Sequence, residues 1–131
     1  MIKRTYERLF ELLDAYQRLC RHRGIQFIVA IHGQRYQVQP RDLEATLETY
    51  SLRRSRFDLM RPNRRIAKFC RRAGIPCLDP TEDMAAEHER TGEQFFMPRG
   101  DMHWNARGAK AFFDGIKIEL GRELVDMSLR Q

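Results

Sequence analysis

Residues 95–113 read FFMPRGDMHWNARGAKAFF, a loop that runs directly into a helix. The loop carries an aspartate and a histidine two positions apart, Asp101 and His103. In an extended segment the side chains at i and i+2 point to the same side, so the Asp101 carboxylate can reach the ring of His103. A carboxylate that holds one ring nitrogen orients a histidine as a base toward a nucleophilic hydroxyl. Asp101 and His103 are therefore candidate catalytic residues; the alternative is that Asp101 caps a turn and His103 packs on Trp104.

The helix after this loop should fix the histidine in place. Asn105 is predicted to be its N-cap, because a short polar side chain can accept an unpaired N–H of a first helical turn. The helix is expected to extend to Val125. Apolar residues at helical spacing are predicted to form its buried face: Ala109, Phe112, Phe113, Ile116, Leu120 and Leu124.

Two helix-to-strand units of similar sequence precede the loop. CRHRGI begins at Cys20 and CRRAGI begins at Cys70, and each joins an amphipathic pattern to a short apolar run. The first helix is expected over residues 2–23. The second is expected to start near Pro62, whose fixed φ suits a first turn, and to end at Gly74.

Each unit ends in a predicted strand. Residues 25–31, IQFIVAI, are apolar and rich in β-branched side chains, which suits a strand buried on both faces of a parallel sheet. Residues 75–78 predict a shorter strand that Pro76 interrupts. His32 follows the first strand at its carboxyl end, where ligands bind in open α/β sheets. His32 is therefore a candidate substrate-binding residue. Trp104, at the junction of loop and helix, is either a second substrate-binding residue or a packing anchor.

Together these elements predict an α/β fold. We expect a partial doubly wound (flavodoxin-like) parallel sheet with few strands and four to five helices, including one after Pro40 and one from Asp79 to about Arg90. A parallel sheet normally has several strands between two layers of helices. Two strands leave both sheet edges open. The chain, as a single domain of residues 1–131, thus looks like half of such a fold, and its open edges offer a route to an oligomer.

The composition limits the cellular locations, cysteine states and cofactors that we expect. The chain is 42% hydrophobic and lacks any apolar run near the roughly 18 residues of a membrane span. Because it also lacks the apolar core of a signal peptide, we expect a cytoplasmic protein, or a periplasmic or anchored one if a preceding segment carries the signal. Three cysteines without C-x-x-C spacing, Cys20, Cys70 and Cys77, predict free thiols. We predict no metal and no cofactor.

The sequence DMHWNARG, residues 101–108, resembles the last conserved block of SGNH (GDSL-type) serine hydrolases and their acyltransferase relatives. Its form is similar to that of SGNH-like proteins that acetylate or deacetylate bacterial polysaccharides. Residues 62–79 resemble the helix and strand before that block. The resemblance implies a serine esterase or O-acyltransferase, with His103 as base and Asp101 as its orienting acid. The substrate it implies is an ester-bearing small molecule or an acylated carbohydrate.

The nucleophile that this resemblance implies is not apparent in the chain. The serines are Ser51, Ser55 and Ser128, and none has the glycine context of a strained nucleophile turn. No residues match the oxyanion hole either. The sequence therefore predicts the C-terminal half of such an enzyme, inactive alone, whose N-terminal half or partner chain carries the serine.

Two other interpretations stay open. The formal net charge is +6, and eight arginines lie within twenty residues: Arg53, Arg54, Arg56, Arg61, Arg64, Arg65, Arg71 and Arg72. They predict either a solvated helix face or a non-catalytic α/β binding module for an anionic partner. Aromatic residues are not interleaved with them, so we do not expect nucleic acid as that partner. A small helical adaptor that pairs through its first helix is the remaining alternative.

Overall fold

The computed structural model describes residues 2–128. Along the chain the elements are α1 (Ile2–His22), β1 (Val29–Ala30), α2 (Arg35–Val38), α3 (Pro40–Thr49), the 3₁₀ turn η1 (Arg54–Arg56), α4 (Arg61–Ala73), β2 (Cys77–Leu78), α5 (Thr81–Thr91) and α6 (Ala106–Ser128).

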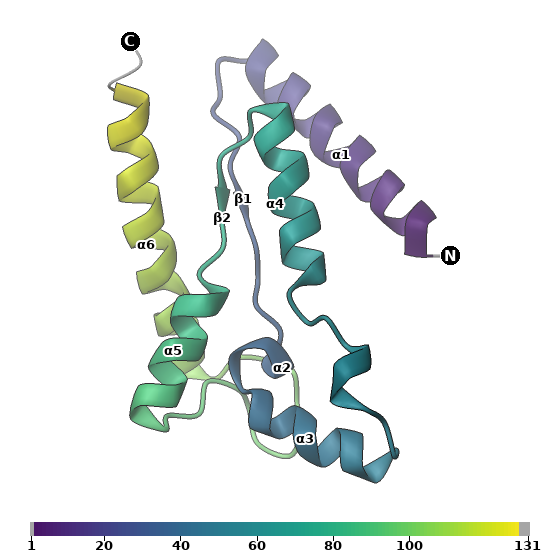
Figure 1. Ribbon diagram of the computed structural model, residues 1–131. Coiled ribbons are helices and arrows are strands. Elements are labelled where there is room, and N and C mark those ends of the chain that lie inside the picture. The colour runs from purple at the N-terminus through teal and green to yellow at the C-terminus, as the bar shows by residue number, and fades with distance from the viewer. Residues whose placement is uncertain (1, 129–131) are drawn as a thin grey trace.

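The two strands lie side by side and parallel, as the two helix-to-strand units predict (Figure 1). Val29 pairs with Cys77, and Ala30 pairs with Leu78. The N–H of Val29 donates to the Pro76 carbonyl at 2.9 Å, and the N–H of Ile31 donates to the Leu78 carbonyl at 2.8 Å. Both strands therefore end at the same edge, followed by His32 on one side and Asp79 on the other.

Helices flank the strand pair on both sides. Figure 1 shows α6 on one side and α4 with α1 on the other. Helix α1 packs on α4 through Phe10 and Phe69, whose rings are stacked with centroids 4.4 Å apart. The buried amide of Gln17 donates to the carbonyl of Ala73 at 2.9 Å. These contacts attach one side of α1 to α4, whereas Leu12, Tyr16 and Leu19 of the same helix are exposed. The alternative of an adaptor that pairs through this helix therefore stays a prediction.

The core lies at the carboxyl ends of the strands, beneath the Asp101–His103 loop. It is built from α2, α5 and the residues before α6, and Trp104, Ala111 and Phe112 pack against it. Its fully buried members are Val38, Met84, Phe95 and Phe96. The loop thus packs on large apolar side chains, which fix the position of the loop relative to the strand ends.

The predicted α/β class is confirmed, with differences in detail. The described residues form six α-helices, more than the four to five predicted. The helix that the sequence did not predict is the four-residue α2. The strands are two residues each, shorter than predicted, since backbone pairing is limited to residues 29–30 and 77–78. Within residues 2–128, no helix is both long and apolar enough to cross a membrane.

The buried face of α6 differs from its prediction at two positions, Ala109, which is exposed, and Phe113. Phe113 was expected to be buried, but it is 64% exposed. Phe112, Ile116 and Leu120 are partly buried, as the apolar spacing indicates. The predicted contribution of the Leu124 side chain lies outside the described residues.

Candidate functional site

Asp101 and His103 make the contact that their spacing predicts. Oδ1 of Asp101 lies 2.7 Å from Nδ1 of His103. The same oxygen accepts the backbone N–H of His103 at 2.8 Å. The backbone hydrogen bond, and after it the ring hydrogen bond, have the largest effects in holding the pKa of the Asp101 carboxyl below its usual value. Asp101 is therefore an ionised acceptor near neutral pH.

This arrangement fixes the tautomer of His103. An ionised carboxylate can only accept hydrogen bonds, so Nδ1 of His103 must be the donor. In the neutral ring the proton then sits on Nδ1, and Nε2 carries the free lone pair. The side chain of His103 is 89% exposed, so Nε2 is open to a partner. The pair can act as a base and its orienting acid, and that catalytic role stays a prediction.

The loop that carries the pair is closed at its base. Phe96 and Trp104 form an isolated antiparallel bridge. The N–H of Met97 donates to the His103 carbonyl at 2.9 Å. The histidine is thus the last residue of a hairpin-like loop, held at its backbone while its ring projects outward.

Asn105 ties the end of this loop to α6. Its side-chain oxygen accepts the N–H of Gly108 at 2.9 Å, the bond expected of an N-cap. Its amide nitrogen donates to the Gln94 carbonyl at 2.7 Å and to the Phe96 carbonyl at 3.3 Å. The predicted cap is confirmed. The Asn-x-x-Gly spacing of the sequence motif therefore has a structural reason beside any catalytic one.

The structure brings together the two residues predicted to bind substrate. The rings of His32 and Trp104 are stacked, with centroids 3.7 Å apart and planes 6° apart. Trp104 also contacts Phe112, with centroids 4.4 Å apart. Within the described residues, Nε1 of Trp104 is buried without a hydrogen-bond partner. Trp104 anchors the loop on the core, while His32 is exposed beside it; contact of either with substrate stays a prediction.

Arg35 is a residue of this site that the sequence did not indicate. It begins α2, just beyond the carboxyl end of β1, and its side chain is only 11% exposed. Nη1 donates to the carbonyls of Met97, at 2.7 Å, and Asp101, at 2.9 Å. Nε donates to Oδ2 of Asp42 at 2.6 Å. Nothing in the sequence distinguishes it from the other basic residues, because its carbonyl partners lie 62 and 66 positions away.

A buried polar cluster closes the carboxyl ends of the strands. The amide of Asn63 donates to both carboxylate oxygens of Asp79, at 3.1 and 3.0 Å, and to the Thr81 hydroxyl at 3.1 Å. Gln37 donates to the Asn63 side-chain oxygen at 2.7 Å. The N–H of Asp79 donates to Glu119 of α6 at 2.7 Å, and burial raises the pKa of Glu119. These mutually satisfied groups join α2, α4, α5 and α6, so we interpret them as structural.

Among the described residues, no serine is a hydrogen-bond partner of His103. Ser51 and Ser55 are in the exposed segment between α3 and α4, and neither hydrogen-bonds to His103 in the part of the chain that the structure describes. The side chain of Ser128 lies outside the described residues. Burial, reinforced by the neighbouring Cys70, raises the pKa of the Cys77 thiol to about 12. A thiol with that pKa is a poor nucleophile near neutral pH.

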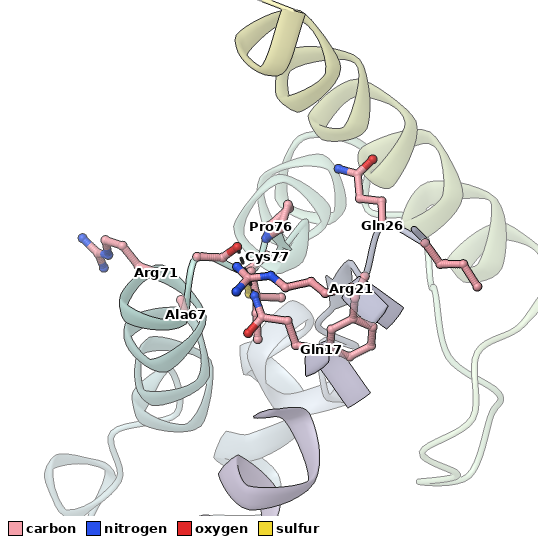
Figure 2. A pocket seen from close by; sticks show the side chains of 11 residues that line it. Gln17, Arg21, Gln26, Ala67, Arg71, Pro76 and Cys77 are labelled. Atoms are coloured by element: carbon pink, nitrogen blue, oxygen red, sulfur yellow. Dashed lines mark hydrogen bonds between the residues drawn. The ribbon is translucent and has the colours of Figure 1, made fainter. Parts of the chain in front are cut away.

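A cavity of about 610 Å³ lies at the opposite end of the sheet, between the ends of α1 and α4 (Figure 2). Its lining includes Gln17, Arg21, Phe27, Arg71 and Cys77. Figure 2 shows Arg71 reaching outward, away from Gln17 and Arg21. Since the cavity is next to the starts of the strands, it is not part of the site around His103.

The arginine-rich segment is mostly solvent-exposed. Seven of its eight arginines are exposed, and Arg65 is partly buried with its guanidinium 3.9 Å from the ring centroid of Tyr6. Arg64 forms an ion pair with Asp58. Within residues 2–128, no group of three or more His, Cys, Asp or Glu side chains is arranged to hold a metal ion.

Comparison with known proteins identifies one family. The model of the family described as an SGNH hydrolase-like domain, acetyltransferase AlgX, matches residues 3–126. Comparisons with curated proteins and with solved structures gave no match. The matched region includes both helix-to-strand units, the Asp101–His103 loop and most of α6.

Proposed function

This chain belongs to the family of SGNH hydrolase-like domains described for the acetyltransferase AlgX, and on that premise we propose that it supplies the base of a serine-dependent site for ester hydrolysis or O-acyl transfer. The coarse class, hydrolase-like or acyltransferase-like, follows from the family. The roles of His103 and Asp101, and the source of the nucleophile, are our proposal.

The observation that carries the proposal is the 2.7 Å contact between Asp101 and Nδ1 of a ring that is 89% exposed. A histidine that only served packing would have its ring against other side chains. Here the carboxylate orients the ring, while Nε2 faces solvent with its lone pair free. That is the state a general base needs before a hydroxyl approaches.

The proposed reaction proceeds in two acyl transfers. Nε2 of His103 accepts the proton of a serine hydroxyl as the serine oxygen attacks the ester carbonyl. Asp101 stabilises the imidazolium that forms, and the imidazolium then returns the proton to the departing alcohol, leaving an acyl-serine. Water or an acceptor hydroxyl repeats the sequence, which releases an acid or a new ester. Because the family is that of an acetyltransferase, we propose acetyl as the acyl group, and we propose a carbohydrate as its carrier.

The serine in this scheme comes from outside the described residues. Among those residues, neither Ser51 nor Ser55 hydrogen-bonds to His103. We propose that a further segment of the protein, or a partner chain, brings the serine and the oxyanion-hole donors to the strand ends. The isolated chain would then have a base without a nucleophile.

The open edge of β1 is our proposed docking place for that part. In the described sheet each strand has one partner. On the far side of β2, α6 covers the strand end and Glu119 accepts the N–H of Asp79. β1 uses the N–H groups of Val29 and Ile31 toward β2, so those of the alternate residues, including Ala30, face the other edge. An added parallel strand there would end beside His32 and the loop of His103.

The proposal is tested by the protonation of His103. In ¹⁵N NMR spectra of the isolated chain, we expect the neutral ring of His103 as the Nδ1–H tautomer. Asp101→Asn should shift the ring toward the Nε2–H form, because the amide no longer requires a donor at Nδ1. If the wild-type ring is in the Nε2–H form, the proposal is refuted, because the free lone pair of His103 is then on Nδ1 and faces Asp101.

The exposed arginines favour one rival function, binding of an anionic polymer. Seven exposed guanidinium groups near α4 would give an affinity that falls steeply with salt. Retention on heparin that is lost when Arg53, Arg54 and Arg56 are replaced by serine would support this rival. No retention at low salt would remove it, and neither result depends on His103.

A further inference from the structure

Arg35 binds the loop of the catalytic pair at two points. Nη1 of its guanidinium donates to the carbonyls of Met97 and Asp101, four residues apart in the loop. The side chain is 11% exposed, and Nε is held by Asp42 of α3. One nearly buried cation therefore joins both ends of the 97–101 segment and attaches them to the start of α3.

Among the described residues, the loop is otherwise held at its base, by the Phe96–Trp104 bridge and the hydrogen bonds of Asn105. All residues from 97 to 103 are exposed. Arg99 and Gly100 have φ values of 62° and 78°, so the chain turns sharply at the tip. Besides the contacts of Arg35, this segment is attached at its base by the bond between the Met97 N–H and the His103 carbonyl.

The contact with Asp101 leads directly to the base. The carbonyl of Asp101 accepts from Arg35, while its carboxylate accepts the backbone and the ring of His103. The bonds between Asp101 and His103 are local and would survive a movement of the whole loop. What Arg35 determines is the place of the pair relative to the end of β1.

The start of α2 is itself held firmly against the strand ends. A Cβ at Gly33 would lie 2.9 Å from the Thr81 hydroxyl and 3.2 Å from a methyl of Val38, so the backbone before α2 is packed tightly on α5. Arg35 extends from this packed segment. Its position is therefore fixed by the sheet end to which we assign the docking of the serine.

We propose that Arg35 is a positioning residue for the acyl-transfer reaction, which sets the distance between Nε2 of His103 and a nucleophile delivered at the end of β1. This inference rests on the proposed function. Among the described residues Arg35 makes no hydrogen bond to the ring of His103, so it acts through the backbone of Asp101. A lysine at this position has a single nitrogen and lacks the planar fork that reaches both carbonyls and Asp42 together.

The first test measures the loop in the isolated chain. In Arg35→Lys, amide hydrogen exchange at Met97 should accelerate by about 10-fold or more, because the loop opens more readily. Exchange at Val29 and Ile31, whose amides bond within the sheet, should not change and reports that the fold is intact. Arg41→Lys, in an exposed arginine of α3, is the matched control and should leave Met97 unchanged. Unchanged exchange at Met97 in Arg35→Lys would overturn the proposal.

The second test measures hydrolysis of an aryl acetate by this chain together with the segment or partner chain that is proposed to carry the serine. Arg35→Lys should lower kcat by about 10- to 100-fold with KM nearly unchanged, as expected for misplacement by about 1 Å. Asp42→Asn, which keeps an oxygen for Nε, should lower kcat less and tests the same contact if the Arg35 variant fails to fold. A faster-exchanging loop with unchanged kcat would overturn the proposal. Failure of the proposed function would appear separately, as activity that persists in His103→Ala.

Discussion

Gly108 lies against the carbonyl of Phe95, so closely that a Cβ at position 108 would be only 2.0 Å from that oxygen. The first turn of α6 and the residues before the loop are therefore in backbone contact, and only glycine allows it. Since Asn105 caps the same turn, the start of α6 and the end of the loop form one rigid unit.

Gly108→Ala should strongly destabilise the fold. The added methyl must displace backbone rather than a flexible side chain, so we expect a loss of about 2–4 kcal/mol in the free energy of unfolding. Gly121→Ala is the matched control, because it lies in the same helix and, among the described residues beyond its own helical turn, no atom lies within 4 Å of the added Cβ. That change should be neutral or stabilising by about 1 kcal/mol. Urea denaturation of both variants decides, and equal stabilities would contradict the tight contact.

Asn105 should tolerate neither alanine nor aspartate. Asparagine both accepts from Gly108 and donates to the Gln94 and Phe96 carbonyls. Aspartate keeps the cap but turns the donor into an acceptor that faces two carbonyls. We expect Asn105→Ala to cost about 1–2 kcal/mol and Asn105→Asp to cost at least as much. Thermal unfolding measures both; an aspartate variant as stable as wild type would show that only the cap matters.

The pKa of Asp101 should report its bonds to His103. We expect ¹³C NMR titration to place it below the ordinary 3.8. In His103→Ala the pKa should rise but stay lowered, because the backbone N–H at position 103 still donates. The variant His103→Asn tests whether another side-chain donor can restore the lowering. An unchanged pKa in His103→Ala would mean that the ring bond is absent in solution.

The same titration determines the sign of the pH effect on stability. A carboxyl whose folded pKa is lowered adds stability above its unfolded pKa, near 3.8, and loses it as pH falls through the folded value. Any contribution of this pair should therefore disappear only below about pH 4. Because the carboxyl is exposed, urea midpoints of wild type and Asp101→Asn should differ little at pH 7.

Cys77 should be nearly inert toward thiol reagents. A rise in pKa from 9.0 to about 12 lowers the thiolate fraction at pH 8 by about 10³-fold relative to an ordinary cysteine. Iodoacetamide labelling of the folded chain, followed by mass spectrometry, should show Cys77 unmodified under conditions that alkylate a free cysteine peptide. Rapid labelling of Cys77 in the folded chain would reopen the question of a thiol nucleophile.

Local patterns in the sequence were enough to predict the contacts of the site that join residues close together in the chain. The spacing of Asp101 and His103 predicted their contact, and the residue type of Asn105 predicted its cap, because both interactions span two or three residues. Arg35 could not be predicted, since its partners depend on how α2 meets a loop more than sixty residues later.

The spacing of apolar residues likewise predicted where the helices lie better than it predicted which of their residues are buried. Phe112 and Phe113 both fit the apolar pattern of α6, but neighbours on a helix point about 100° apart. Phe112 packs on Trp104, and Phe113 is left 64% exposed. The strands were predicted too long for a related reason. An apolar run indicates burial, whereas strand length depends on which backbone groups find a partner, here only at residues 29–30 and 77–78.

His103 is proposed to be a base whose nucleophile lies outside this chain, and covalent labelling can locate that nucleophile. The protein is taken from its natural source, with any accompanying segment or chain, and treated with a fluorophosphonate; mass spectrometry then maps the labelled serine. We predict a label beyond residues 1–131, formed about 10³-fold more slowly or not at all in His103→Ala. A label on Ser51, Ser55 or Ser128, a labelling rate that is unchanged in His103→Ala, or no label at all would contradict the proposal.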